Sequence, residues 1–299
     1  MGRNPRRNLI GKAALQEKSA ELAIPMEQLL AAYVMEQLVV MLSESERGGS
    51  LLLKNPGALG LSGIGKGSSH RLYYAYVRRI GERFQKADFA VFLKSTIKWE
   101  TQTNISWSWR SRMEDSRLIV ELVAVLDDMR MPVSLVIDPV DEDMVCDRSG
   151  TCPVRLIMEN NKVCPIAVYP AKEQFFEDLG TALTGLELIT DMAVYARIYE
   201  ALGMLDFEGR RFQKSLEVYC AEHAITLDEV RFSQMERYLT YPYMEKKWKS
   251  YQKKQRSRLP GWMEVYGRFW DFLMPPWTAC LQGMIYLGSW IPELGRYLD

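Results

Sequence analysis

The sequence has few of the residues that build metal centres. Only two histidines occur, His70 and His223, and they lie far apart along the chain. Its five cysteines include Cys146, Cys152 and Cys164, which lie near one another but form no tight pair. Structural zinc sites use closely spaced cysteines or histidines. We therefore expect no structural zinc site.

The chain also lacks a secretory signal and a long hydrophobic run. An odd number of cysteines in such a chain favours reduced thiols and a cytoplasmic location. The longest apolar stretch, residues 277–291, is bracketed by Pro275, Pro276 and Pro292. It is shorter than the ~20 residues that cross a bilayer. We expect a terminal helix packed on its own domain, and no membrane partner.

Net charge is absent as well, because 38 basic residues balance 38 acidic ones. The overall charge therefore gives no argument for nucleic-acid or membrane binding. Two local basic segments exist, at residues 1–7 and 246–258. The second, "KKWKSYQKKQRSR", has too many cations for one helix face, so we expect part of it to be exposed. It fits either a phosphate-binding helix or a solvated one.

The 299 residues are 47% hydrophobic, enough for one large domain or two modest ones. Apolar spacing predicts two helices within residues 9–46 and another over 69–85. Strand patterns follow at 88–94, 96–109, 117–127, 131–138, 153–158 and 165–170. Helical patterns then cover 172–187, 190–202, 210–224, 228–238, 243–255, 262–273 and 277–290. We predict an α/β fold with a mixed sheet in residues 1–170, and a helical domain in 171–299.

One glycine-rich stretch, "GLSGIGKGSSHRL" at residues 60–72, has the composition of a phosphate-binding turn. Glycine lets backbone N–H groups approach an anion, and lysine adds a charge. The predicted helix 69–85 would add its positive end. The candidate phosphate ligands are Lys66, Gly67 and Ser68. A P-loop is a weaker interpretation, because "KNPGAL" separates the turn from the preceding strand.

Several strings carry a family resemblance, in order and spacing more than in any one motif. They are "LLAAYVMEQLVVMLSESE", "SRLIVELVAVLDDMRMPVSLVID", "IAVYPAKEQFFEDLGTAL", "DFEGRRFQKSLEVYCAEHAITL" and "MEKKWKSYQKKQ" followed by "WMEVYGRFWDFLMP". Together they resemble the AbiEii/MenT-type nucleotidyltransferase toxins across most of residues 9–276. The resemblance implies a polymerase-β-like core, Mg²⁺ and a nucleoside triphosphate. It also implies transfer of a nucleotidyl group to an acceptor such as tRNA, and a cognate antitoxin.

The family's glycine-rich turn and its Asp-x-Asp strand can be placed here in two ways. In the first, Lys66 to Ser68 form the turn, and "ERFQKADFAVF" is the strand with Asp88 as its carboxylate. The positions two residues away are Lys86 and Ala90, so the second carboxylate is missing. In the second, Lys54 belongs to the turn, and "SSHRLYYAYV" is the strand, with no aspartate. The metal-binding pair is incomplete in both.

Other family positions are partly kept. Asp138 matches a strand-end aspartate, and Asp191 matches the first aspartate of a C-terminal segment whose second is Val194 here. A family lysine is replaced by Asp178. The resemblance therefore implies Asp88, Asp138 and Asp191 as catalytic residues, with Asp88 and Asp138 as metal ligands.

Each aspartate also has a purely structural interpretation. Asp138, before Pro139, fits the start of a turn, and Asp191 fits a helix cap. Asp88 fits the end of a helix before a strand. The acidic loop 138–147 lacks the spacing of an EF-hand, which favours a solvated loop.

Two classes of function follow. One is a nucleotidyltransferase-like toxin with a degenerate active site. The other is a non-catalytic relative that binds nucleotide, RNA or a partner protein. A P-loop phosphotransferase comes third.

Overall fold

The structure of the protein is a computed structural model. It describes residues 10–64, 70–79, 81–97, 104–114, 116–142, 145, 150–159, 162–255 and 259–298. The chain divides into two compact units, Met1–Pro170 (unit 1) and Ala171–Asp299 (unit 2), each described here by itself. The boundary follows Pro170, where the sequence pattern changes from strands to helices.

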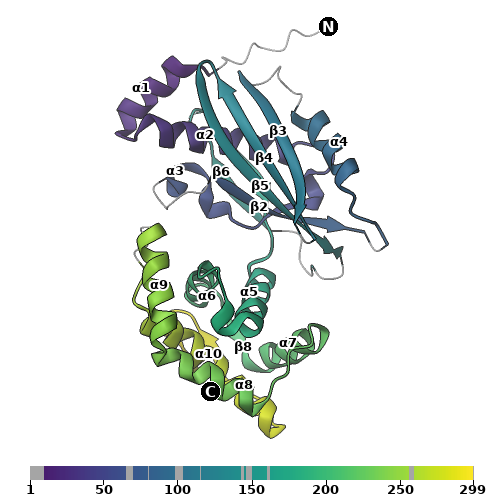
Figure 1. Ribbon diagram of the computed structural model, residues 1–299, viewed down its shortest axis with the longest axis vertical. Coiled ribbons are helices and arrows are strands. Elements are labelled where there is room, and N and C mark those ends of the chain that lie inside the picture. The colour runs from purple at the N-terminus through teal and green to yellow at the C-terminus, as the bar shows by residue number, and fades with distance from the viewer. Residues whose placement is uncertain are drawn as a thin grey trace. The chain divides into compact units, whose positions relative to one another are not determined.

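Unit 1 combines helices with a mixed sheet (Figure 1). Its helices are α1 (Lys12–Leu22), α2 (Met26–Ser43), α3 (Gly60–Gly63) and α4 (Lys86–Ile97), with short 3₁₀ turns at Gly48–Ser50 and Pro56–Ala58. Its strands are β1 (Leu51–Leu53), β2 (Arg71–Arg78), β3 (Ile105–Glu114), β4 (Arg117–Leu126), β5 (Met129–Asp141), β6 (Thr151–Arg155) and β7 (Val163–Ala167). The predicted α/β class and mixed sheet are confirmed.

Five strands form the main sheet in the order β1-β2-β5-β4-β3. Only the β2–β5 pair in this sheet is parallel, and the other pairs are antiparallel. Side chains alternate between the two faces of a strand. On one face, residues such as Leu72, Tyr74 and Leu135 join the core formed with α1, α2 and α4. We call the opposite side the outer face.

Strand β2 replaces the helix predicted for residues 69–85, so that prediction is wrong. Leu72, Tyr74 and Tyr76 face the helical core, whereas Ala75 and Val77 join a small cluster on the outer face. A central strand buried on both sides has a nearly continuous apolar run, which also fits a helical period. Its tyrosines and valine favour a strand.

Helix α4 replaces the strand predicted for residues 88–94, and that prediction is also wrong. Phe89, Phe92, Leu93 and Ile97 are buried and follow helical spacing. The aromatic residues of "DFAVFLK" favoured a strand by composition. Packing of one helical face on the core decided the outcome.

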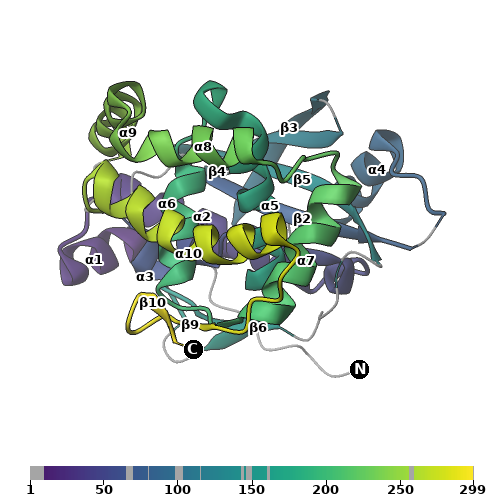
Figure 2. The same cartoon turned by 90° about the horizontal axis from the view of Figure 1, so that it is seen from below.

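Unit 2 consists of helices around an aromatic core, with one small sheet (Figure 2). Its helices are α5 (Ala171–Gly185), α6 (Ala193–Leu202), α7 (Gly209–Glu222), α8 (Glu229–Arg237), α9 (Pro242–Gln255) and α10 (Trp262–Gln282), with 3₁₀ turns at Leu186–Leu188 and Tyr238–Thr240. Strands β8 (Phe207–Glu208), β9 (Ser289–Ile291) and β10 (Arg296–Leu298) form the sheet. The predicted helical character of this region is confirmed.

Helix α10 joins the two terminal helices predicted at 262–273 and 277–290. It continues through Pro275 and Pro276 and ends at Gln282, before Gly283 with a φ of 65°. Each proline lacks an N–H and weakens the helix. Leu273, Pro276 and Trp277 are buried, and their packing keeps the helix continuous. No helix in the described part of the chain is long and apolar enough to cross a membrane.

Candidate functional site

Asp138 lies on the outer face of β5, where two cations hold its carboxylate. The Lys54 Nζ is 3.1 Å from Oδ2, and the Arg117 Nε is 2.8 Å from Oδ1. The Lys54 side chain is 6% exposed and that of Asp138 17%, so water screens this pair weakly. Arg117 is 61% exposed and contacts the other oxygen of the same carboxylate. We call Lys54, Arg117 and Asp138 the Asp138 cluster.

The turn after β1 fixes the position of Lys54. Its backbone N–H donates to the Tyr73 carbonyl over 2.8 Å. The side chain of Asn55 then donates to the Arg71 carbonyl and accepts the Tyr73 N–H, both at 2.9 Å. The Lys54 Nζ also lies 4.8 Å from the centre of the Tyr169 ring, within cation–π range. The ammonium therefore lies between the Asp138 carboxylate and the Tyr169 ring.

Strand β2 provides no acidic partner for Asp138. Ala75 pairs with Asp138 in the parallel register, and Tyr73 and Val77 lie on the same face. Within the residues that the structure describes, no three acidic, histidine or cysteine side chains gather closely enough to hold a metal ion. Asp138 is thus a single carboxylate that is already paired with cations.

Asp88 is exposed in the first turn of helix α4, not on a strand of the sheet. The placement that made "ERFQKADFAVF" the carboxylate strand is therefore wrong, as is the interpretation of Asp88 as a helix end. An acidic side chain in a first helical turn interacts favourably with the helix dipole. Its position in α4 explains Asp88 without a metal.

Lys66, Gly67 and Ser68 lie outside the described residues, and so does most of the acidic loop after Glu142. The flanking elements are described. Helix α3 ends at Gly63, and strand β2 begins at Arg71. No helix follows the glycine-rich turn, so the predicted helix end for phosphate is wrong. A P-loop also needs a helix directly after its turn, and the described strand does not supply it.

Asp191 lies in unit 2, where it supports the start of helix α6. Its Oδ1 accepts the Ala193 N–H at 3.0 Å. Its Oδ2 is 3.9 Å from the Arg197 Nη1, and the side chain is exposed. The N-cap residue of α6 is Met192, so Asp191 is not the cap itself but forms a turn directly before the helix.

Asp178 forms a buried pair with Arg197, a residue that the sequence did not single out. The Arg197 Nη2 donates to Oδ1 at 2.6 Å and its Nε to Oδ2 at 3.0 Å, a two-pronged arrangement between α5 and α6. The Asp178 side chain is 5% exposed, and that of Arg197 is 42% exposed. Burial raises the pKa of Asp178, and the guanidinium opposes that rise. Asp178 therefore has a structural role in unit 2.

Glu36 is a buried acid that pairs with no cation among the residues that the structure describes. It lies in α2 with 1% exposure, and its Oε2 accepts the Ile157 N–H at 3.0 Å. Its Oε1 is buried and has no hydrogen-bond partner. Burial raises the pKa of Glu36 to about 8, the Ile157 N–H opposes the rise and nearby Glu159 adds to it. A lone acid within the apolar run of α2 was the signal in the sequence.

Helix α9 presents exposed lysines, as expected for part of the basic segment. Lys246, Lys249, Lys253 and Lys254 are exposed, and Lys249 pairs with Glu245 at 2.6 Å. Lys247 instead donates to the carbonyls of Glu187 and Ile189, at 2.7 and 2.8 Å. Arg256 and Arg258 lie outside the described residues.

No protein-family model matches the chain, and no curated protein matches it. Among solved structures, the crystal structure of JHP933 from Helicobacter pylori aligns with a TM-score of 0.30 and 13% identity, covering 76% of this chain and 97% of that chain. A likeness at this TM-score carries no argument about fold or function. The proposals below depend on the residues of this chain.

Proposed function

We propose that the protein is a degenerate relative of the AbiEii/MenT-type nucleotidyltransferases that binds a nucleoside triphosphate without metal and does not transfer the nucleotidyl group. The observation that carries the proposal is the ion pair of Lys54 and Asp138, 3.1 Å apart, beside Ala75. Lys54 pairs with the Asp138 carboxylate, and the neighbouring position on β2 is an alanine and not a second acid.

The order of elements supports the placement with Lys54 in the turn. Strand β1 leads into Lys54, β2 returns antiparallel to β1, and Asp138 lies on the strand beside β2. The resemblance implies the same succession along the chain of a turn, the strand that would carry the acidic pair, and a later strand-end aspartate. The acidic pair of the family would then fall on outer-face positions of β2, among Tyr73, Ala75 and Val77, and none is acidic. Two-metal transfer needs carboxylates that bridge the ions.

Charge explains how the cluster functions without metal. Lys54 and Arg117 together bring two positive charges to Asp138, as one Mg²⁺ ion would. The Arg117 guanidinium is 61% exposed, so it can meet a ligand from solvent. Lysine binds phosphate as a point charge, and arginine binds it in a forked geometry. The cluster can therefore attract a triphosphate, but it holds no ion to activate an attacking oxygen.

A transfer assay tests the absence of catalysis. The protein is incubated with labelled nucleoside triphosphates, Mg²⁺ or Mn²⁺ and total tRNA, and labelled RNA is measured. We expect no incorporation above that of Asp138→Asn. Robust incorporation that Asp138→Asn abolishes would overturn the proposal.

That second result would favour an active nucleotidyltransferase toxin, with Asp138 as its surviving metal ligand. Under that alternative the acceptor is tRNA and an antitoxin is the partner, as the resemblance implies. Asp138 is the observation that favours it, because its carboxylate lies on the outer face beside β2.

A further inference from the structure

The outer face of the main sheet carries exposed polar side chains in regular rows. Strand register places Arg110, Glu121, Ser134 and Arg71 side by side across β3, β4, β5 and β2. The next row, farther from the Asp138 cluster, is Ser108, Val123 and Pro132. Arg71, Ser108, Arg110, Val123 and Pro132 are all exposed. This surface is therefore open over several strands of unit 1.

Positive charge exceeds negative charge on this surface. Arg110 and Arg112 share Glu121, with N–O distances of 2.5 and 2.6 Å, and Arg112 also pairs with Glu114 at 2.8 Å. These two arginines are therefore balanced by two acids, and the excess comes from other arginines. Arg71 and Arg130 are exposed and form no ion pair within the described part of the chain. The whole chain carries no net charge, so the excess on this face is local and attracts anions.

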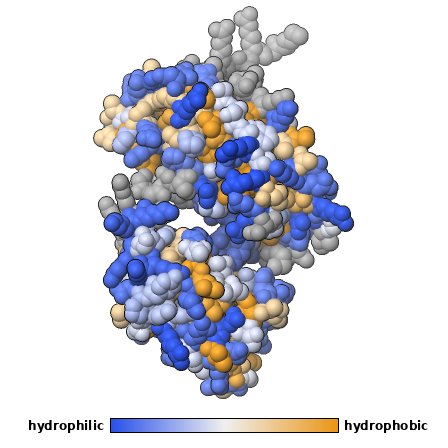
Figure 3. Space-filling view, viewed as in Figure 1, coloured by the Kyte–Doolittle hydropathy of each residue, from blue (hydrophilic) through white to orange (hydrophobic). Residues whose placement is uncertain are grey.

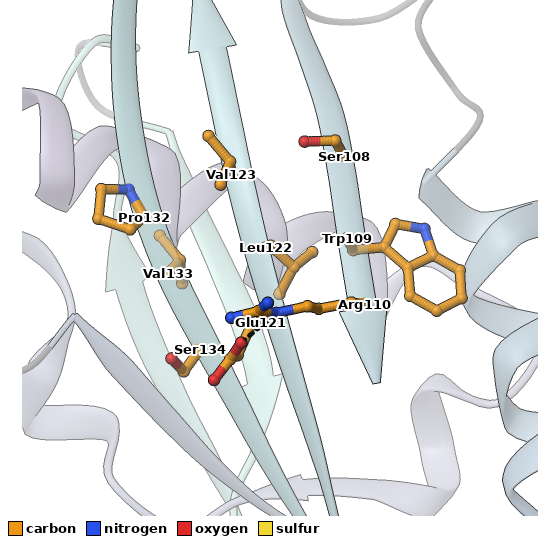
Figure 4. Close-up of a pocket in the computed structure, with 9 residues that line it drawn as sticks. All are labelled: Ser108, Trp109, Arg110, Glu121, Leu122, Val123, Pro132, Val133 and Ser134. Carbon is orange, nitrogen blue, oxygen red and sulfur yellow. Dashed lines mark hydrogen bonds and ion pairs between the residues drawn. The ribbon is translucent and has the colours of Figure 1, made fainter. Parts of the chain in front are cut away.

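A shallow groove crosses the same rows (Figure 4). Val123 and Pro132 form an apolar floor, with the hydroxyls of Ser108 and Ser134 beside it. Arg110 reaches across β4 toward Glu121. In the space-filling view, hydrophilic side chains predominate on the visible face of unit 1, and hydrophobic ones form small separate groups (Figure 3). An extended chain with anionic links and flat apolar groups fits such a surface better than an apolar helix does.

We propose that the outer sheet face binds single-stranded RNA. The arginines pair with phosphates, the apolar floor receives bases, and the serine hydroxyls hydrogen-bond the ribose 2′-OH groups. The surface lies on β2 to β5 and does not include the Asp138 cluster. RNA binding and triphosphate binding can therefore be tested separately.

The test uses fluorescence anisotropy with labelled oligouridine on the full chain at low salt. We expect Arg71→Glu with Arg130→Glu to weaken RNA binding at least about tenfold, and to flatten its salt dependence, because phosphate contacts release counterions. The matched control is Lys253→Glu with Lys254→Glu on α9, which we expect to change affinity less than about twofold. The milder pair Arg71→Gln with Arg130→Gln repeats the test if the reversed pair fails to fold.

Oligodeoxyuridine of the same length distinguishes RNA from other polyanions, and we expect it to bind more weakly. Equal binding of DNA and RNA, RNA binding lost only in the α9 variant, or no RNA binding at low salt would each overturn the proposal. Titration of a nucleoside triphosphate into Arg130→Glu alone separates the two sites, because Arg130 lies away from the Asp138 cluster, whereas the Arg71 carbonyl is bound by the turn that positions Lys54.

Discussion

The two units compensate a buried carboxylate in different ways. In unit 2, Asp178 has one cation, Arg197, in a two-pronged pair. In unit 1, Glu36 pairs with no cation among the described residues and accepts one backbone N–H. Asp138, also in unit 1, has two cations. The number of cations separates three cases: a neutral acid in the core, a structural ion pair, and a carboxylate held between two cations.

The largest effect is expected at Glu36, because burial raises the pKa of this carboxyl to about 8. The pKa rises from 4.5 to about 8 in the folded protein. Folding therefore favours the protonated form, so its stabilising contribution is full below pH 4.5 and is lost as the pH rises through about 8. Glutamine at this position is always neutral.

We therefore expect Glu36→Gln and the unchanged protein to have similar stability at acidic pH, and the variant to be more stable, by up to about 4 kcal/mol, at alkaline pH. Urea unfolding followed by circular dichroism over that pH range measures the difference. Glu27→Gln, on the exposed side of the same helix, is the control. A constant difference at all pH values would show that Glu36 stays ionised.

The next effect concerns the structural pair in unit 2. Asp178→Asn removes the two-pronged partner of the Arg197 guanidinium, which keeps only Asp191 at 3.9 Å, and breaking buried pairs costs about 3–5 kcal/mol. Arg197 is 42% exposed, so we expect a smaller loss, about 2 kcal/mol, in the unfolding free energy of unit 2. The control is Asp191→Asn, whose exposed side chain should contribute less than about 1 kcal/mol. Equal losses would remove the distinction between the two acids.

In the Asp138 cluster we expect a loss of binding more than of stability. Lys54→Ala removes the charge that meets phosphate, and charged hydrogen bonds contribute about 1.5–3 kcal/mol. Triphosphate affinity should fall roughly tenfold or more, as measured by calorimetry. Lys247→Ala in unit 2 is the control, because that lysine donates to backbone carbonyls. Unchanged affinity in Lys54→Ala would remove the cluster from the binding site.

The smallest effect is expected at Asp88. Loss of one exposed acid in the first turn of α4 should cost about 0.3–1 kcal/mol of stability through the helix dipole. Triphosphate binding should not change. A clear loss of triphosphate binding in Asp88→Ala would show that Asp88 belongs to the triphosphate-binding site.

Sequence reasoning identified the larger elements because their patterns were long. The two N-terminal helices, β4, β5 and the helices of unit 2 follow their apolar spacing. The sequence predicted a helix at β2 and a strand at α4, because short apolar runs fit both the helical and the strand period. Burial of Ala75 and Val77 on the second face of β2 decided for a strand, and that depends on residues far along the chain.

The candidate site could be predicted only in part. Asp138 and Lys54 were both named, but their pairing depends on the turn at Asn55, which no local pattern specifies. Arg117 and Arg197 were missed, because a partner across strands or helices is chosen by the fold. The sequence shows Glu36 as a single acid within an apolar run. It does not show that no described cation pairs with this acid in the folded protein.

The central claim is that the cations of the Asp138 cluster take the place of a metal ion. Calorimetric titration of a nucleoside triphosphate, once with Mg²⁺ and once with excess EDTA, tests it most directly. We expect the same affinity in both titrations, and a large loss in Lys54→Ala in both. Binding that requires Mg²⁺ and survives Lys54→Ala would contradict it.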